Sequence, residues 1–296
     1  MADNVQLKKM DMHVHTRFST EESDLKGVKI SISMASDPVE LYKKAKTKGM
    51  DFVTFTDHNT IDGCLYFLEK MPDVKDFIIG EEITAHDPEY GFVIHINVYD
   101  ITKAQHKKIS RLKDDFYKLT SYLKKQNIFY CYNHPYWQCQ HDYLAATEKP
   151  QQRVYEIAKH FPLIEGINSF RLKQQNQMAR KMAKELGITS IAGSDSHGGG
   201  IGRAYTMAKA NNVKDFLKEI KEGRAQVRGW NYSFKGLYEE CMNIALTNVN
   251  KVKEEYPSKK LKVMMDLFAN PLAKFFVRRH IKKNVRIQKK AIKPYQ

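Results

Sequence analysis

Short apolar segments rich in β-branched and aromatic residues alternate with helical patterns over the first 230 residues of this 296-residue chain. Each segment is about as long as a typical strand. Six are strong and the one nearest the N-terminus is weaker: Leu7–Val14, Phe52–Thr56, Phe77–Ile79, Phe92–Val98, Ile128–Tyr132, Leu163–Ile167 and Thr189–Ala192. Strands that alternate with helices favour a parallel sheet or barrel. We therefore expect an α/β barrel of about seven strands.

Helical patterns and one turn complete this expectation. Asp37–Pro38 begins one helix, because aspartate caps a helix and proline suits its first position. Glycine after the last turn closes a helix, as Gly187 does here. The helices expected cover about residues 37–49, 102–126, 174–186 and 213–221. His86–Gly91 is expected to be the turn of a hairpin.

Histidine and acidic residues lie at or near the ends of six of these strand segments. They are His13, His15, Asp57, His58, Glu81, Glu82, His95, His134, Asp195 and His197. Residues two apart on a strand share a face, so His13 and His15 can reach one ion. The carboxyl ends of barrel strands form one face, where active sites lie. The sequence therefore predicts a single pocket lined by histidines and carboxylates.

The composition of that pocket indicates metal ions. Imidazole with carboxylate suits Zn²⁺, Mn²⁺ or Fe better than Mg²⁺ or Ca²⁺, which prefer oxygen ligands alone. The residues outnumber the ligands that one ion needs, so two or three ions are expected. Taken singly, each histidine could be a structural or solvated residue, and Asp57 could cap a helix. These explanations do not predict that every strand end carries a residue of this kind.

Several motifs follow one another in this order along the chain. They are Asp11–Thr16 (DMHVHT), Phe55–Thr60 (FTDHNT), Ile79–Thr84 (IGEEIT), His95, Asn133–Pro135 (NHP) and Gly193–His197 (GSDSH), followed by Ile201–Ala204. As a set, over about residues 8–230, they resemble the PHP (polymerase and histidinol phosphatase) family of metal-dependent phosphoesterases. The resemblance implies a distorted seven-stranded β/α (TIM-like) barrel with a trinuclear metal site.

The resemblance also implies which residues bind metal. The ligands carried over are His13, His15, His58, Glu82, His95, His134, Asp195 and His197. Members of the family often place a histidine or aspartate five or six residues after the second histidine of the first motif. Those positions are Thr20 and Glu21 here, so Glu21 is the ninth candidate, with Glu22 and Asp24 as substitutes. Without a ligand there, the site would hold two ions, or gain its third only with substrate.

The implied activity is hydrolysis of a phosphate ester, in which a hydroxide bridging two metal ions attacks phosphorus. The substrate expected is a nucleotide or another small phosphomonoester. Asp195 is expected to bridge or anchor the ions, and Asp57 to orient His58. Arg203 follows the glycine-rich stretch 198–202 and is expected either to hold phosphate or to form an ordinary salt bridge. His197 or a metal-bound water would protonate the leaving group.

The positive charge of the chain is concentrated at its C-terminus. The net charge is +15, and residues 251–296 hold 14 lysines and arginines against three acidic residues. We expect a barrel domain over residues 1–230 and a basic, mainly helical extension over 231–296, with helices at about 234–250 and 259–283. Residues 251–296 could be a solvated surface, contact an anionic membrane, or guide nucleic acid into a nuclease site. A catalytically inactive PHP-type binding module is the remaining alternative.

The expected location is the cytoplasm. No apolar run approaches the roughly 18 residues of a membrane span, and residues 1–9 lack an apolar signal core. The four cysteines, Cys64, Cys131, Cys139 and Cys241, form no CxxC pair. Cys139 and His141 have no zinc-finger spacing. The sequence leaves the oligomeric state open.

Overall fold

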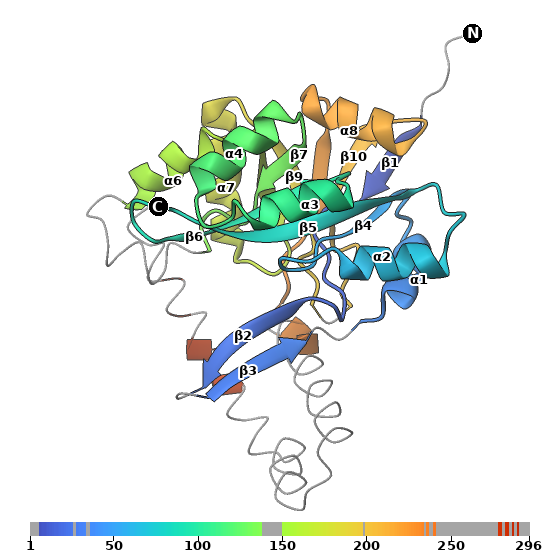
Figure 1. Ribbon diagram of the computed structural model, residues 1–296, viewed down its shortest axis with the longest axis horizontal. Coiled ribbons are helices and arrows are strands. Elements are labelled where there is room, and N and C mark those ends of the chain that lie inside the picture. The colour runs from blue at the N-terminus through green and yellow to red at the C-terminus, as the bar shows by residue number, and fades with distance from the viewer. Residues whose placement is uncertain are drawn as a thin grey trace, which may run out of the picture.

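The computed structural model describes residues 6–25, 28–33, 36–137, 150–197 and 199–233, together with isolated positions between 235 and 289. Its centre is a curled six-stranded sheet with the order β4-β5-β6-β7-β8-β9 (Figure 1). The strands are β4 (Val53–Phe55), β5 (Phe77–His86), β6 (Val93–Tyr99), β7 (Phe129–Tyr132), β8 (Leu163–Asn168) and β9 (Thr189–Gly193). These are the six strong apolar segments of the sequence, so an α/β fold is confirmed.

The weak N-terminal segment does not become a strand of this sheet. Leu7–Met10 forms β1, which pairs with β10 (Ala204–Lys209) in a second sheet. The residues after β1 lie between the two edges of the six-stranded sheet. The N–H of Thr56, after β4, donates to the carbonyl of Val14 at 2.8 Å, and Val14 bridges Ser196 beyond β9. The first motif thus contacts both edges of the curled sheet, although the continuous sheet has six strands.

The strand directions differ from the parallel arrangement that we expected. β4 and β5 are parallel, as are β7, β8 and β9, but β6 runs antiparallel to both of its neighbours. The reason is the short turn after β5, since only antiparallel strands can be joined so closely. The hairpin predicted around His86–Gly91 is confirmed, and the N–H of Gly91 donates to the carbonyl of Asp87 at 2.7 Å.

Seven helices accompany these strands in the described part of the chain: α1 (Pro38–Thr47), α2 (Asp62–Lys70), α3 (Lys103–Ser110), α4 (Phe116–Lys125), α6 (Pro150–Ala158), α7 (Lys173–Leu186) and α8 (Val213–Lys221). The helix predicted over 102–126 is wrong as a single helix. Thr102 caps α3 with a capping box, and the Asp115 side chain accepts the N–H of Lys118 to begin α4. A polar side chain that caps a second helix interrupts the first, which apolar periodicity alone does not reveal.

Two smaller strand groups were not predicted. β10 also pairs with β11 (Gln226–Gly229), and β2 (Thr20–Leu25) forms a hairpin with β3 (Val28–Ser33). Among the described residues, β2 and β3 form a two-stranded sheet of their own. The candidate ligand Glu21 lies in β2.

Apolar side chains fill both faces of the large sheet. Ile94 and Ile96 of β6 pack with Phe116 and Leu123 of α4 in the largest cluster of fully buried residues. On the other side, Phe52 and Phe216 pack with their ring centroids 5.3 Å apart. Each buried side chain of this size stabilises the fold by about 1.5–3 kcal/mol. The two layers hold the ends of the strands, and therefore the site, in fixed positions.

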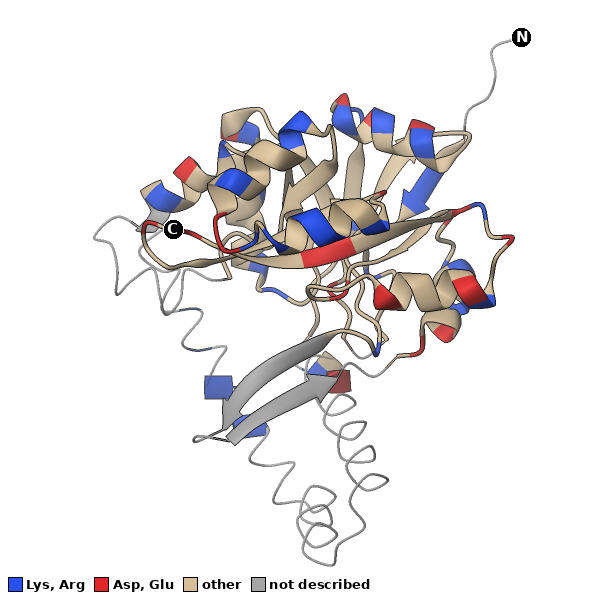
Figure 2. Cartoon of the chain, viewed as in Figure 1, with Lys and Arg blue, Asp and Glu red and all other residues tan. Residues whose placement is uncertain are grey.

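Most charged residues lie on the outer surface, but several are buried. Lysine, arginine and acidic residues are distributed over the helices that cover the sheet (Figure 2). The acidic stretch Glu81–Glu82 of β5 is among the buried charged residues. No described helix combines the length and the apolar character that crossing a membrane requires. Cys139, His141 and residues 241–277 lie outside the described residues, so the C-terminal extension remains a prediction.

Candidate metal centre

The Glu82 carboxylate lies at the middle of a group of buried histidines. Its Oε2 atom is 3.1 Å from His13 Nε2, 3.2 Å from His15 Nε2 and 3.2 Å from His58 Nδ1. His13 and His15 come from the segment that follows β1, and His58 follows β4. Histidines from two segments that are distant in sequence thus converge on one oxygen atom of Glu82.

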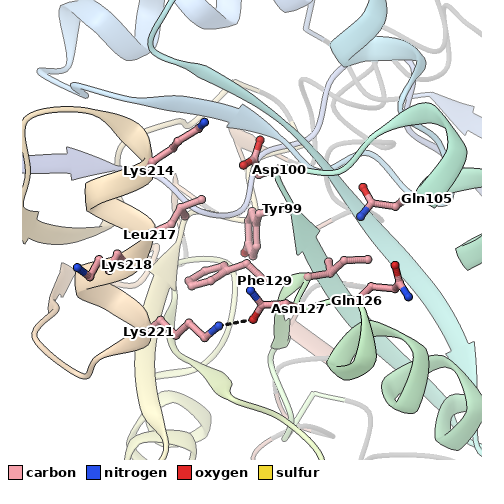
Figure 3. A pocket seen from close by; sticks show the side chains of 11 residues that line it. Tyr99, Asp100, Gln105, Gln126, Asn127, Phe129, Lys214, Leu217, Lys218 and Lys221 are labelled. Carbon is pink, nitrogen blue, oxygen red and sulfur yellow. Dashed lines mark hydrogen bonds between the residues drawn. The ribbon is translucent and has the colours of Figure 1, made fainter.

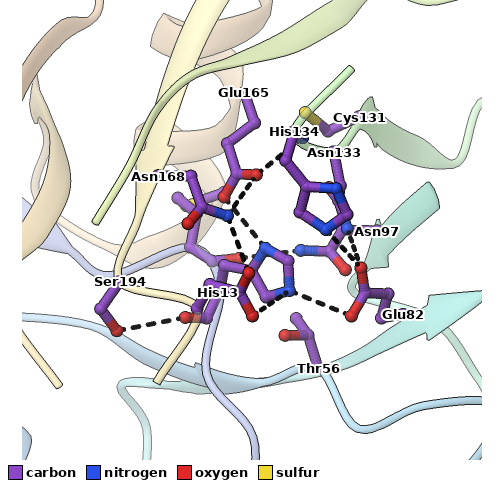
Figure 4. Close-up of polar contacts among 12 residues, drawn as sticks. His13, Thr56, Glu82, Asn97, Cys131, Asn133, His134, Glu165, Asn168 and Ser194 are labelled. Atoms are coloured by element: carbon purple, nitrogen blue, oxygen red, sulfur yellow. Dashed lines mark hydrogen bonds and ion pairs between the residues drawn. The ribbon is translucent and has the colours of Figure 1, made fainter. Parts of the chain in front are cut away.

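The other oxygen of Glu82 meets a second pair of histidines. Oε1 lies 3.0 Å from His95 Nδ1 and 3.2 Å from His134 Nε2, and it accepts a hydrogen bond from Asn133 at 2.9 Å (Figure 4). His95 is near the beginning of β6, and because that strand is antiparallel its beginning lies where the neighbouring strands end. The candidate residues can therefore meet in one pocket although the six strands are not all parallel.

Asp195 approaches the same histidines from β9. Its Oδ1 atom is 3.5 Å from His13 Nε2, 3.3 Å from His15 Nε2 and 3.4 Å from His197 Nδ1. Its Oδ2 atom faces elsewhere, 2.7 Å from the Arg171 guanidinium and 3.0 Å from the Asn168 amide. Only one oxygen of Asp195 is thus directed at the histidines.

Hydrogen bonds from outside the cluster hold the imidazole rings in place. Glu165 Oε1 is 2.9 Å from His13 Nδ1, and its other oxygen accepts the backbone N–H of His134 at 2.9 Å. Ser19 Oγ is 3.1 Å from His15 Nδ1. His197 Nδ1 is 2.7 Å from the carbonyl of Asp195. Partners of this kind fix the ring and its tautomer, which leaves the opposite nitrogen for the centre.

The sequence analysis missed Glu165, Ser19, Asn168 and Arg171. Glu165 had a usable signal, because it is an acidic residue inside the buried apolar segment of β8. Arg171 lies three residues beyond the end of β8, in a loop that no motif marks.

The backbone is held in an unusual conformation at the same place. His134 has φ 27°, Asp195 has φ 52°, and Asn59, next to His58, has φ 56°. Residues other than glycine rarely adopt positive φ, which costs about 1–3 kcal/mol and often marks functional sites. The N–H of Asp195 donates to the carbonyl of His13 at 2.8 Å, one of the bonds that hold this conformation.

The close packing of unlike charges shifts the pKa values of the cluster. Burial opposes the charged form of His13, but Glu82 and Asp195 outweigh it and raise the pKa of His13 well above its ordinary value. The same balance raises the pKa of His15 to about 9. Burial acts to raise the pKa of the Glu82 carboxyl, but the histidines around it hold that pKa well below its usual range. A metal ion must therefore compete with protons for these rings.

These residues fit divalent metal ions. Four groups of three have ligand atoms within 4.8 Å of one another, and every member is buried: His15–His58–His197, His13–His134–Glu165, His13–His15–Asp195 and His58–Glu82–His95. His134 Nδ1 is buried without a hydrogen-bond partner among the described residues. Imidazole and carboxylate together suit Zn²⁺, Mn²⁺ or Fe. The cluster thus has the donor set of a divalent-metal site.

The remaining predicted site residues lie around the cluster. Both carboxylate oxygens of Asp57 accept hydrogen bonds from Thr16, at 2.6 and 2.7 Å, so Asp57 fixes the segment that carries His15. The guanidinium of Arg203 lies 4.1 Å from the ring centroid of Tyr232. The backbone places Glu21 in β2, which pairs only with β3.

A separate groove lies at the opposite end of the strands from the histidine cluster. It has a volume of about 350 Å³ and lies between α8 and the strands β6 and β7 (Figure 3). Phe129, at the start of β7, lines it, whereas His134 follows the end of that strand. Lys214, Lys218 and Lys221 of α8 border it. None of the predicted site residues lines this groove.

Comparisons with known proteins agree with the motifs. A family described as PHP-associated matches residues 173–225. An uncharacterised protein of Methanocaldococcus jannaschii is 39% identical over 83 residues, which are 27% of this chain and 47% of that protein. The match thus spans about half the length of this curated relative.

Two solved structures share the fold. A two-domain protein of Bacteroides vulgatus, described as containing a PHP-like metal-dependent phosphoesterase, has a TM-score of 0.53 at 20% identity, over 81% of this chain and 71% of that chain. PsfC of Pseudomonas syringae has a TM-score of 0.51 at 13% identity, over 82% of this chain and 97% of that chain. The PHP-associated match and the shared fold confirm the resemblance of this chain to the PHP-domain family.

Proposed function

We propose that this chain hydrolyses phosphate esters with two or three divalent metal ions held by the histidine–carboxylate centre. The observation that carries the proposal is the position of Glu82, whose two oxygens lie 3.0–3.2 Å from the nitrogens of different histidines. The proposed ligands are His13, His15, His58, Glu82, His95, His134, Asp195 and His197, with Glu21 as a ninth. The PHP-like phosphoesterase in the Bacteroides structure supports the same activity.

Glu82 and Asp195 have different proposed roles. Glu82 presents one oxygen to His13, His15 and His58 and the other to His95 and His134, so both of its oxygens would be available to hold ions. Asp195 directs one oxygen to histidines and gives the other to Arg171 and Asn168. Asp195 would therefore hold an ion through that first oxygen alone.

The ions, when bound, would acidify a water molecule and neutralise charge on the phosphoryl oxygens. The chain contributes a fixed, buried frame for that chemistry. Glu165 and Ser19 hold the rings of His13 and His15 so that Nε2 of each faces the centre. His197 is bonded through Nδ1 to the carbonyl of Asp195, which leaves its Nε2 as the nitrogen that would bind an ion.

The proposed substrate is a nucleotide or another small phosphomonoester. The test is phosphate release in Mn²⁺ from nucleoside bisphosphates, mononucleotides, sugar phosphates, histidinol phosphate and 5′-phosphorylated oligonucleotides. His13→Ala serves as the blank. Turnover of one group by the wild-type protein alone supports the proposal and identifies the substrate class. Turnover confined to oligonucleotides supports the nuclease alternative, and no turnover with metal bound supports a non-catalytic module.

Asp195→Asn tests the site itself. The amide keeps the size of the side chain but loses the charge that pairs with Arg171 and faces three histidines. We expect turnover to fall by at least about 100-fold, with an unchanged circular-dichroism spectrum. A variant with normal turnover would show that Asp195 takes no part in the reaction.

A further inference from the structure

Arg171 is a buried cation that adjoins the metal centre. Its Nη2 atom lies 2.7 Å from Asp195 Oδ2, and its side chain is 10% exposed. The guanidinium also lies 4.5 Å from the centroid of the Trp137 ring. Contact with a carboxylate on one side and an aromatic face on the other holds a planar guanidinium in one orientation.

Part of its hydrogen-bonding capacity is unused. The Nε atom of Arg171 is buried and has no hydrogen-bond partner among the described residues. Buried donors are almost always satisfied, and a donor that is not satisfied by protein indicates a ligand or water. A guanidinium can serve two anions at once, because its donors point in fixed, different directions.

The guanidinium is placed where a substrate anion would bind. Trp137, on which it lies, has its ring centroid 5.4 Å from that of His134 and 5.8 Å from that of His95. Arg171 therefore contacts Asp195 directly and lies on the Trp137 ring, which is itself beside His134 and His95.

We propose that Arg171 binds the phosphoryl group of the substrate. The Nε–H of Arg171 donates to a phosphoryl oxygen while Nη2 stays paired with Asp195. The inference rests on the proposed function, and its ligand is a terminal phosphoryl group or another tetrahedral oxyanion. It gives Arg171 the role that the sequence suggested for Arg203, whose guanidinium lies over Tyr232.

The test compares phosphate binding with metal binding in Arg171→Lys. Lysine keeps the charge but lacks the second donor direction, so it can serve only one of the two anions well. Arg180→Lys is the matched control, because Arg180 is exposed on α7. Metal-loaded proteins are titrated with inorganic phosphate by calorimetry, and metal-free proteins are titrated with Mn²⁺. A second variant, Trp137→Leu, removes the ring under the guanidinium.

We expect Arg171→Lys to weaken phosphate binding by about 10–100-fold. Mn²⁺ affinity should change less than about threefold, and Arg180→Lys should match the wild-type protein. Trp137→Leu should weaken phosphate binding by about threefold or more. Equal phosphate affinity in Arg171→Lys and the wild-type protein overturns the inference. The inference is also overturned if Arg171→Lys binds fewer metal ions but still binds the same amount of phosphate for each ion that remains. Arg171 would then only hold Asp195 in place.

Failure of the proposed function has a different signature. In that case the metal-loaded wild-type protein itself binds no phosphate and releases none from any ester. The assignment of Arg171 fails alone when the wild-type protein binds phosphate and the two arginine variants bind it equally.

Discussion

At the scale of single residues, the site depends on partners that do not belong to the ligand set. Glu165 contacts His13 through one oxygen and the backbone of His134 through the other. A partner of this kind fixes ring orientation and makes the imidazole a better ligand. The ligands therefore hold their geometry only while this second layer is intact.

We predict that Glu165→Gln weakens Mn²⁺ binding by about 10–100-fold and leaves the fold intact. Glutamine keeps the volume but loses the charge beside His13 and one of the two acceptors. The measurement is a Mn²⁺ titration of the metal-free protein. Glu69→Gln is the control, since the Glu69 side chain is 75% exposed. Equal Mn²⁺ affinity in the two variants would mean that Glu165 does not support the centre.

A second acid–imidazole pair, outside the centre, joins α3 to β5. His106 Nδ1 lies 2.8 Å from Oε2 of the buried Glu81. The hydrogen bond to Glu81 raises the pKa of His106, and burial raises that of Glu81. Both groups thus bind protons more tightly in the folded state. Their contribution to stability is full below the unfolded pKa values and decreases as the pH rises through the folded ones.

We therefore predict that His106→Ala lowers the free energy of unfolding by about 1–3 kcal/mol at pH 6.5, because it leaves the Glu81 carboxyl without its partner. The difference in unfolding free energy between His106→Ala and the wild-type protein should become smaller as the pH is raised toward 9. Urea unfolding at several pH values measures it, with His86→Ala as a half-exposed control. A difference that grows with pH would contradict this assignment.

At the scale of elements, the centre is built where the first motif contacts β9. Gly193 ends β9, and a Cβ there would lie 2.3 Å from the Cβ of His13 and 2.7 Å from its backbone nitrogen. The glycine therefore lets β9 approach the segment that carries His13 and His15 closely.

We predict that Gly193→Ala destabilises the protein by about 1–3 kcal/mol through overpacking and also weakens Mn²⁺ binding. Gly49→Ala is the comparison, because its methyl group meets no atom within 4 Å and reports only the positive φ of 77°. Denaturant unfolding and Mn²⁺ titration of both variants give the two quantities. If both variants bind Mn²⁺ as the wild-type protein does, the close approach of β9 has no part in shaping the centre.

Sequence periodicity predicted the six strands of the main sheet because each is a short apolar segment in the core. The hairpin predicted at His86–Gly91 implied that β6 runs antiparallel to β5, but the expected parallel sheet did not include the antiparallel pairing of β6 with β7. Sequence periodicity also joined α3 and α4, because their apolar residues continue the same face across the turn that Asp115 caps. The hairpin of β2 and β3 was missed because β2 is polar, and the alternation of Val28, Ile30 and Ile32 in β3 was an unused signal.

The eight ligand candidates taken from the sequence motifs lie in one buried cluster, because the strand ends of a curled sheet meet at one place. Glu165, Ser19 and Asn168 were missed because their contacts depend on the packing of segments far apart in sequence. Arg171 was missed for the same reason. Its pairing with Asp195 joins two loops that follow neighbouring strands, β8 and β9.

At the scale of the whole molecule, the described residues form a histidine–carboxylate cluster at one end of the strands of the curled sheet and a lysine-bordered groove at the opposite end. The Glu82 carboxylate links the histidines of the first two motifs to those of β6 and of the loop after β7. The central claim is that metal ions held around this carboxylate drive hydrolysis of a phosphate ester.

The most direct test is a Mn²⁺ titration of the chelator-treated protein, with bound metal and released phosphate measured on the same samples. Glu82→Gln is titrated in parallel. We predict that the wild-type protein releases phosphate only once more than one ion per chain is bound, and that Glu82→Gln binds fewer ions and releases none. Phosphate release by the metal-free protein, or full activity in Glu82→Gln, would contradict the account.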